Sequence, residues 1–110
     1  MTSACALPKL WDLIHEATGI DGARSLHLAV GRPPLVRVPE EGLRELRPDL
    51  PIIDRNSIIV LLCGVIDPER WDAIEAIGDG EILLSRGLAG SPITLNVFRN
   101  SESWSAVVHL

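Results

Sequence analysis

The segment from Ser25 to Val38 constrains the fold more than any other part of this sequence. Leu26, Leu28 and Val30 recur at every second position, which is the period of a β-strand. Residues 31–34 then read Gly-Arg-Pro-Pro, a combination typical of a turn, and another short apolar run follows. Because strands joined by so short a connection pair antiparallel, the segment predicts a β-hairpin.

Five further stretches have the sequence pattern of strands. We expect them at residues 35–38, 43–46, 81–85, 93–98 and 104–108. The clearest is 93–98, where Ile93, Leu95 and Val97 alternate with Thr94, Asn96 and Phe98. Turns are expected at residues 39–42, 79–80, 87–90 and 100–102. Neighbouring strands joined by such turns favour an antiparallel sheet.

Three helices are also expected. Apolar residues at three- and four-residue spacing predict the first from about 8 to 18. Asp54 is placed to cap a second, from about 55 to 66, which is apolar nearly all round and is therefore buried or in contact with a partner. The third begins at Asp67-Pro68 and ends at Gly78. Its core-facing residues are expected to be Trp71, Ile74 and Ile77.

The order of these elements is helix, three strands, two helices, three strands. Strands joined by hairpins, with the helices gathered together, are typical of the α+β class. We therefore expect a six-stranded, mainly antiparallel sheet with three helices. A chain of 110 residues has the length of one domain, so residues 1–110 are assigned to a single domain with residues 1–6 frayed.

The charge balance argues against a nucleic-acid partner. The formal net charge is −5, whereas nucleic-acid binding needs a basic surface. The densest group of cations comprises Arg32, Arg37, Arg44 and Arg47. Three glutamates, residues 40, 41 and 45, are interleaved with it, so we interpret it as the solvated side of a hairpin.

We expect a cytoplasmic protein without membrane insertion. Residues 1–7 lack both the basic region and the long apolar run of a signal peptide. The longest apolar run, Ile58–Ile66, is too short to cross a bilayer. The two cysteines, Cys5 and Cys63, form neither a CxxC pair nor a disulfide framework, which fits a reducing compartment.

No group of residues predicts catalysis. A phosphate-binding loop ends in a lysine after a glycine-rich turn, and the only lysine, Lys9, has no such turn before it. The three histidines, His15, His27 and His109, have no zinc-like spacing, and no Gly-x-Ser-x-Gly motif occurs. The apolar surroundings of Cys63 would raise its thiol pKa and leave it unreactive. We expect no enzyme, no catalytic, metal or nucleotide-binding residue, and no cofactor.

Two stretches resemble a known family. Residues 25–38 read S-L-H-L-A-V-G-R-P-P-L-V-R-V, and residues 93–100 read I-T-L-N-V-F-R-N. Together they look like the N-terminal domain of the type IV pilus retraction and type II secretion ATPases, the PilT-like proteins. The resemblance spans roughly residues 7–110 and implies a PAS-like fold. The residues that match the motifs are His27, Gly31, Pro33, Pro34, Arg37, Asn96, Phe98 and Arg99.

The sequence also departs from that family. Ser25 stands where the family usually has aspartate, and Thr94 replaces an arginine that lies near the nucleotide in family members. The ATPase motifs that follow this domain in the family are absent from these 110 residues. Two interpretations stay open, an excised N-terminal domain and a free-standing relative, and the start at Met1 and the loss of the arginine favour the second.

The resemblance implies a non-catalytic interaction and regulatory module of type IV pilus (twitching motility) or type II secretion machinery. In the family this domain packs against the motor domain of a neighbouring subunit in a hexameric ring. The partner expected here is a pilus or secretion ATPase, or a second copy. Candidate contact residues are Ile58, Ile59, Leu62 and Phe98.

Two other functions are alternatives to an interaction module. A PAS-like small-molecule sensor would hold its ligand between the sheet and the helices, with tryptophans lining the pocket. The tryptophans that such a pocket could use are Trp11, Trp71 and Trp104. An enzyme would need a converging set of polar groups, and the sequence offers none.

Overall fold

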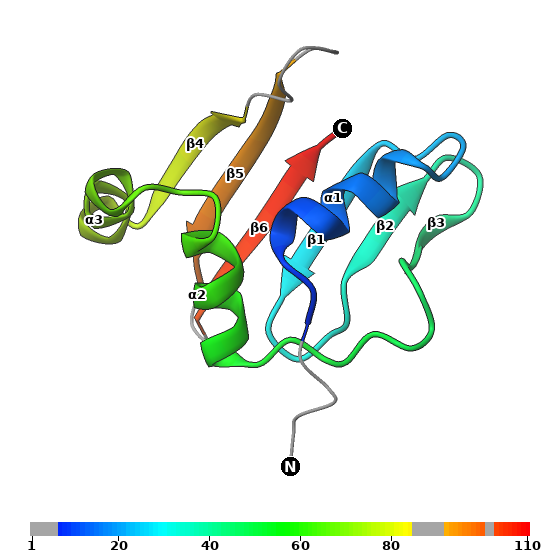
Figure 1. Ribbon diagram of the computed structural model, residues 1–110, viewed down its shortest axis with the longest axis horizontal. Helices are drawn as coiled ribbons and strands as arrows, with labels where there is room; N and C mark the ends of the chain where they lie inside the picture. Colours follow the sequence, from blue (N-terminus) through cyan, green and yellow to red (C-terminus); the bar gives the residue numbers. More distant parts are fainter. Residues whose placement is uncertain (1–6, 85–91, 101–102) are drawn as a thin grey trace.

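A computed structural model describes residues 7–84, 92–100 and 103–110 of the chain (Figure 1). The expected turn at 87–90, the residues 1–6 expected to be frayed, and Cys5 lie outside these ranges. The helices are α1 (Leu10–Thr18), α2 (Arg55–Cys63) and α3 (Pro68–Ile77). The strands are β1 (Ser25–Ala29), β2 (Leu35–Val38), β3 (Gly42–Glu45), β4 (Asp79–Leu84), β5 (Ile93–Arg99) and β6 (Trp104–His109).

The six strands form one open sheet in the order β3-β2-β1-β6-β5-β4. All neighbouring strands pair antiparallel. The sheet therefore consists of two three-stranded units, β1 to β3 and β4 to β6, which are joined where β1 pairs with β6. This confirms the predicted α+β class and the predicted order of elements.

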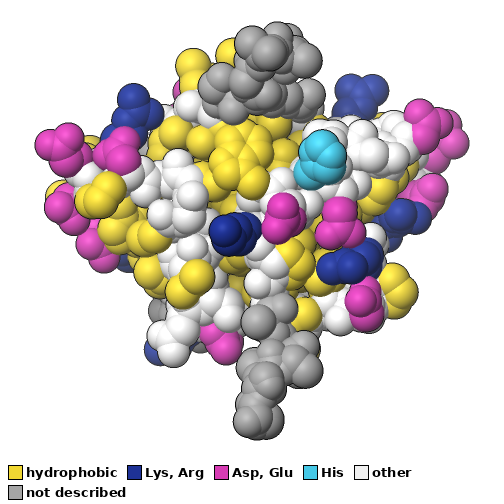
Figure 2. Space-filling model, viewed as in Figure 1, with side chains coloured by type: hydrophobic (Ala, Val, Ile, Leu, Met, Phe, Trp, Pro, Cys, Tyr) yellow, Lys and Arg dark blue, Asp and Glu magenta, His cyan; other side chains and the backbone are white. Residues whose placement is uncertain are grey.

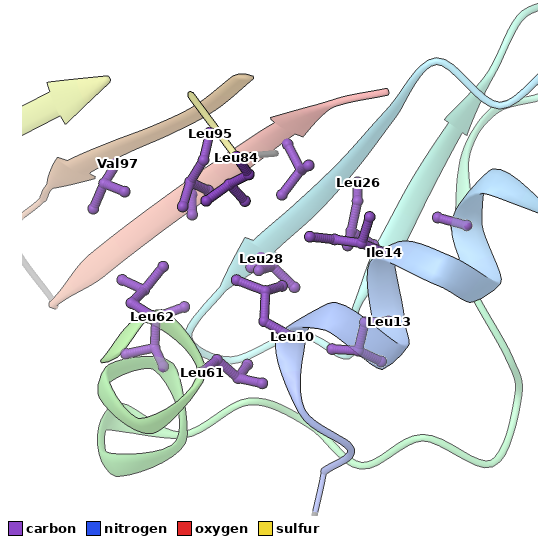
Figure 3. Packing of buried hydrophobic residues seen from close by; sticks show 14 of the residues in the cluster. Leu10, Leu13, Ile14, Leu26, Leu28, Leu61, Leu62, Leu84, Leu95 and Val97 are labelled. Atoms are coloured by element: carbon purple, nitrogen blue, oxygen red, sulfur yellow. The ribbon is translucent and has the colours of Figure 1, made fainter. Parts of the chain in front are cut away.

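The helices α1 and α2 lie over one side of the sheet, with α1 in front of β1 and β2 and α2 near β6, and α3 lies at the β4 edge (Figure 1). Apolar side chains from α1, α2 and alternate strand positions meet in one core (Figure 3). Leu10, Leu13, Leu26, Leu62 and Leu95 are essentially inaccessible to solvent. Since each such side chain contributes about 1.5–3 kcal/mol when buried, this shared core holds the two layers together.

The helix ends follow local rules. Asp54 accepts a hydrogen bond from the Ser57 backbone N–H (2.8 Å), which also lowers the pKa of this carboxyl. The Asp67 side chain accepts a hydrogen bond from the Arg70 backbone N–H (2.9 Å) at the start of α3, where proline occupies the first turn. Gly78 ends α3 with φ of 103°, in the left-handed region that favours glycine. These ends confirm the predicted caps.

Two predictions around the end of α3 are wrong. Ile77 is 74% exposed, because Trp71 and Ile74 face the core and a position three residues further turns away from it. Residues Asp79 and Gly80 do not form a turn, since Gly78 alone reverses the chain and β4 starts at the next residue. The strand thus begins earlier than its alternating pattern indicated.

Candidate functional site

The sheet side opposite the helices is the candidate functional surface, and we call it the open face. Strand alternation assigns a residue to this face when its neighbours in sequence point into the core. The open face comprises Ser25, His27, Ala29, Leu35, Arg37, Leu43, Glu45, Asp79, Glu81, Leu83, Thr94, Asn96, Phe98, Ser105, Val107 and His109. None of the three described helices lies on this side (Figure 1).

Strand register arranges these residues in rows that run across the sheet. One row contains Ala29, Ser105, Phe98 and Asp79, from β1 to β4. The next contains Leu35, His27, Val107, Asn96 and Glu81. A third contains Arg37, Ser25, His109, Thr94 and Leu83. Residues that are far apart in sequence therefore become direct neighbours on one surface.

A shallow hollow of about 160 Å³ lies in the open face. The small residues Ala29 and Ser105 occupy adjacent places in it, and Phe98, which is 41% exposed, stands directly beside Ser105. His27, Arg32, Pro33, Leu35, Leu43 and Val107 also line it. The surface thus combines a shallow hollow with a partly exposed aromatic ring, and aromatic residues are enriched at protein interfaces.

Two pairs of polar side chains on the open face are hydrogen-bonded. The Ser25 hydroxyl and the His27 Nε2 are 2.8 Å apart, and the Asn96 Nδ2 lies 2.8 Å from the His109 Nε2. Partial burial lowers the pKa of His27, and the nearby charges of Arg37 and His109 lower it further. The imidazole is therefore held mainly neutral at physiological pH.

Charge is divided between the two sides of the open face. Arg37 lies on β2, and Arg32 borders the hollow at the β1–β2 turn. Asp79 and Glu81 lie on β4, at the opposite edge of the sheet. The β4 side of the face is therefore acidic, whereas the opposite side carries Arg32 and Arg37 together with Glu45 on β3. On the helix-bearing side, by contrast, acidic and basic side chains are interspersed (Figure 2).

Some residues of the Gly-Arg-Pro-Pro segment stabilise the turn, and others border the hollow of the open face. Gly31 has φ of 91°, and its N–H donates to the carbonyl of Ile53 (2.9 Å), while Arg32 accepts from the Ile53 N–H (2.9 Å). This pair ties the hairpin turn to the segment before α2. Pro34 is buried and its carbonyl accepts from Leu46, whereas Pro33 borders the hollow.

Arg99 lies apart from the other motif residues, toward the helix layer. Its guanidinium lies 4.9 Å from the centroid of the Trp104 ring and donates to the carbonyl of Glu75 in the last turn of α3. Its backbone N–H donates to the carbonyl of Gly78 (2.8 Å). Because the last carbonyls of a helix lack partners within it, Arg99 caps α3 and fixes it to β5.

The helix α2 offers less contact surface than its sequence indicated. Ile58 and Leu62 are completely buried in the core of this chain, so neither is available to a partner. Ile59 is partly buried, and the exposed apolar residue of α2 is Val60. The aliphatic character of this helix is explained by its central place in the core.

Several other sequence predictions concern residues outside the open face. Arg44 pairs with Glu41 at 3.6 Å, and Arg47 pairs with Glu16 at 3.1 Å, with all four side chains substantially exposed. Partial burial raises the pKa of Cys63, in the predicted direction, and Glu75 adds to the effect. Within residues 7–84, 92–100 and 103–110, no three metal-binding side chains come together.

No helix in the described parts of the chain is both long and apolar enough to cross a membrane.

A second hollow, of about 530 Å³, lies between the start of α1 and the helix α2. It is lined by Leu7, Pro8, Lys9, Leu10, Asp54, Asn56, Ser57, Val60, Leu61 and Gly64. No residue of the two family motifs borders it, and neither does any tryptophan. Trp71 and Trp104 instead pack on each other in the core, with ring centroids 4.9 Å apart.

Sequence reasoning missed part of the open face. The place of Asp79 was hidden by the predicted turn, and the role of Ala29 and Ser105 as the base of a hollow depends on strand register. Alternation in the sequence identifies which residues share a face of one strand. It does not say which strands are neighbours, and β1 and β6 are separated by most of the chain.

Neither the protein-family models nor the curated proteins that were compared with this sequence give a match. Solved structures, by contrast, do match this chain. The pilus retraction motor PilT with bound ADP superposes with a TM-score of 0.77 at 26% identity, over 94% of this chain and 29% of that one. The chain has the fold of the N-terminal domain of PilT-like ATPases.

A second solved structure extends the likeness in fold. The ATPase DotB from Legionella pneumophila superposes with a TM-score of 0.69 at 10% identity, over 99% of this chain and 31% of that one. This chain thus spans less than a third of the length of either ATPase. The similarity to PilT concerns its N-terminal portion and supports a domain related to pilus ATPases.

Proposed function

We propose that this chain is a non-catalytic interaction and regulatory module of type IV pilus or type II secretion machinery, acting in the cytoplasm. Its partner would be a PilT-like ATPase, which it would contact through the open face. The likeness to part of the PilT motor supports this proposal, because that part is joined in PilT to the remainder of a motor protein.

One observation carries the proposal. The two family motifs, which lie far apart in sequence, contribute His27, Pro33 and Phe98 to a single hollow on the open face. None of these residues is needed there to fill the core, and Phe98 exposes 41% of its surface. Aromatic residues beside such hollows are frequent sources of binding energy in protein interfaces.

The experiment is a binding measurement between the purified chain and a PilT-like ATPase from the same organism. We expect wild type to bind and to change the ATPase rate, and Phe98→Ala to bind at least tenfold more weakly, since removal of a central aromatic residue typically costs about 2 kcal/mol or more. Ile77→Ala is the matched control, because Ile77 is 74% exposed on α3, away from the open face. Absence of binding by wild type would refute the proposal.

A small-molecule sensor is the second candidate function. The hollow of about 530 Å³ between α1 and α2 has the size of a ligand site. It lies between two helices, however, whereas the space between the sheet and the helices is filled by core side chains. The open face therefore gives stronger support to an interaction module.

A further inference from the structure

The open face has a shape that can fit a copy of itself. Phe98 on β5 and Ala29 on β1 flank Ser105 on β6 in one row of the sheet. They therefore lie at equal distances, about 4.8 Å, on either side of the same residue. One side of Ser105 carries a protruding aromatic ring and the other a small side chain at the base of the hollow.

A twofold rotation about an axis parallel to β6, lying against the open face, exchanges these two sides. It places Phe98 of each copy over Ala29 of the other, so that each ring enters the hollow of its partner. We propose that two copies of this chain pair through the open face in this way. The proposal rests on the open face being the interaction surface and names a second copy as its occupant.

The charges of Asp79 and Arg32 favour this arrangement. Asp79 lies two strands from β6 on one side, and the β1–β2 turn with Arg32 lies between the first and second strands on the other. The same rotation therefore brings Asp79 of one copy near Arg32 of the other, twice per pair. A twofold axis that runs across the strands would instead place Arg32 and Arg37 of one copy near the same arginines of the other, and like charges in contact oppose association.

A second copy complements the charges of the open face better than a partner whose surface carries charge of only one sign. A uniformly acidic partner would match Arg32 and Arg37 but would repel Asp79 and Glu81. In a twofold pair the same patch serves both copies, and each one supplies both the ring and the hollow.

The size of the face predicts reversible pairing. Six strands about 4.8 Å apart and about five residues long give a flat area of roughly 400 Å² per copy. Two copies would then bury a total of about 800 Å², which is below the roughly 1,200–2,000 Å² of standard specific interfaces and in the range of weak, transient contacts. We therefore expect a dimer that forms at tens to hundreds of micromolar protein, on the order of the affinity of transient complexes.

The test measures mass in solution by sedimentation or light scattering over a range of concentrations. Wild type should rise from 12.0 kDa toward twice that mass. Arg32→Asp alone and Asp79→Arg alone should each weaken pairing at least tenfold, because each creates two like-charge contacts. An equimolar mixture of these two variants should dimerise again, since both contacts between them are then of opposite charge. The double variant should also recover pairing.

Two controls make the result specific. Asp72→Arg changes an exposed carboxylate on α3 and should leave the dimer unchanged, whereas Phe98→Ala should weaken it. Circular dichroism checks that every variant is folded. A wild type that stays monomeric at about 1 mM, or a mixture that stays as monomeric as its components, would overturn the proposal. If wild type is monomeric yet binds the ATPase, this inference fails while the proposed function stands.

Discussion

At the scale of single residues, the family motif around His27 serves two purposes. Gly31 and Pro34 build the hairpin turn and its contacts with neighbouring backbone. His27 and Pro33 lie at the hollow of the open face. The same motif therefore builds the hairpin turn and contributes side chains to the open face. Because histidine changes its charge closer to neutral pH than other side chains do, the environment of His27 can be measured directly.

We predict that part of the pH dependence of stability comes from His27. Burial, Arg37 and His109 lower its pKa in the folded chain, while an unfolded histidine has a pKa of about 6.5. The folded state then binds fewer protons, so the contribution is fully present above pH 6.5 and is lost as pH falls through the folded pKa. Free energies of unfolding from urea titrations between pH 7.5 and 5 should decline for wild type and decline less for His27→Gln. Equal declines would contradict the assignment.

At the scale of elements, the attachment of α3 to the sheet depends on residues far apart in sequence. Arg99 on β5 caps the end of α3. Gly80 on β4 lies beneath Ile74, and a Cβ at this position would come within 2.7 Å of the Ile74 Cγ1. The absence of a side chain at Gly80 is what allows helix and strand to approach so closely.

We predict that Gly80→Ala destabilises the chain by about 1–3 kcal/mol, since the added methyl group must displace Ile74. Urea denaturation gives the change in the free energy of unfolding. Gly19→Ala is the control, because Gly19 is in the right-handed region and its Cβ would make only ordinary contacts. In an Ile74→Ala background the cost of Gly80→Ala should largely disappear. If the cost is undiminished there, strain elsewhere is responsible.

The same elements show what the sequence could predict. Alternation and helical spacing predicted all six strands, the three helices and the caps at Asp54 and Asp67. These features depend on neighbouring residues. The exposure of Ile77, the contact between Gly80 and Ile74, and the capping of α3 by Arg99 depend on how separate elements meet. Sequence patterns carry no direct information about such contacts.

At the scale of the whole molecule, a single core spans both three-stranded units of the sheet. Its buried residues come from α1, α2, α3 and from strands of both units. Pairing between β1 and β6 continues the hydrogen bonding across the junction. We therefore expect the two three-stranded units to unfold together. The open face also depends on the whole molecule, because it forms only when β1, β5 and β6 are neighbours in the sheet. The sequence patterns did not predict which strands are neighbours.

We predict that the chain unfolds in one cooperative transition. Far-ultraviolet circular dichroism reports on the backbone, and tryptophan fluorescence reports on Trp11 in α1 and on the packed pair Trp71 and Trp104. The two probes should give the same urea midpoint and the same slope, about 1–3 kcal/mol per molar urea. Separate midpoints would show that the surroundings of the tryptophans and the backbone structure unfold in different steps, and would contradict the prediction.

The position of β6 has a consequence for the order of events during synthesis. A ribosome makes β1 to β3 first and β4 and β5 afterwards, yet the strand that lies between these two groups is made last of all described elements. Until residues 104–109 have emerged, β1 and β5 each present an unpaired edge, and exposed edges are prone to pair with other chains. A nascent chain is thus vulnerable until its final strand enters the middle of the sheet.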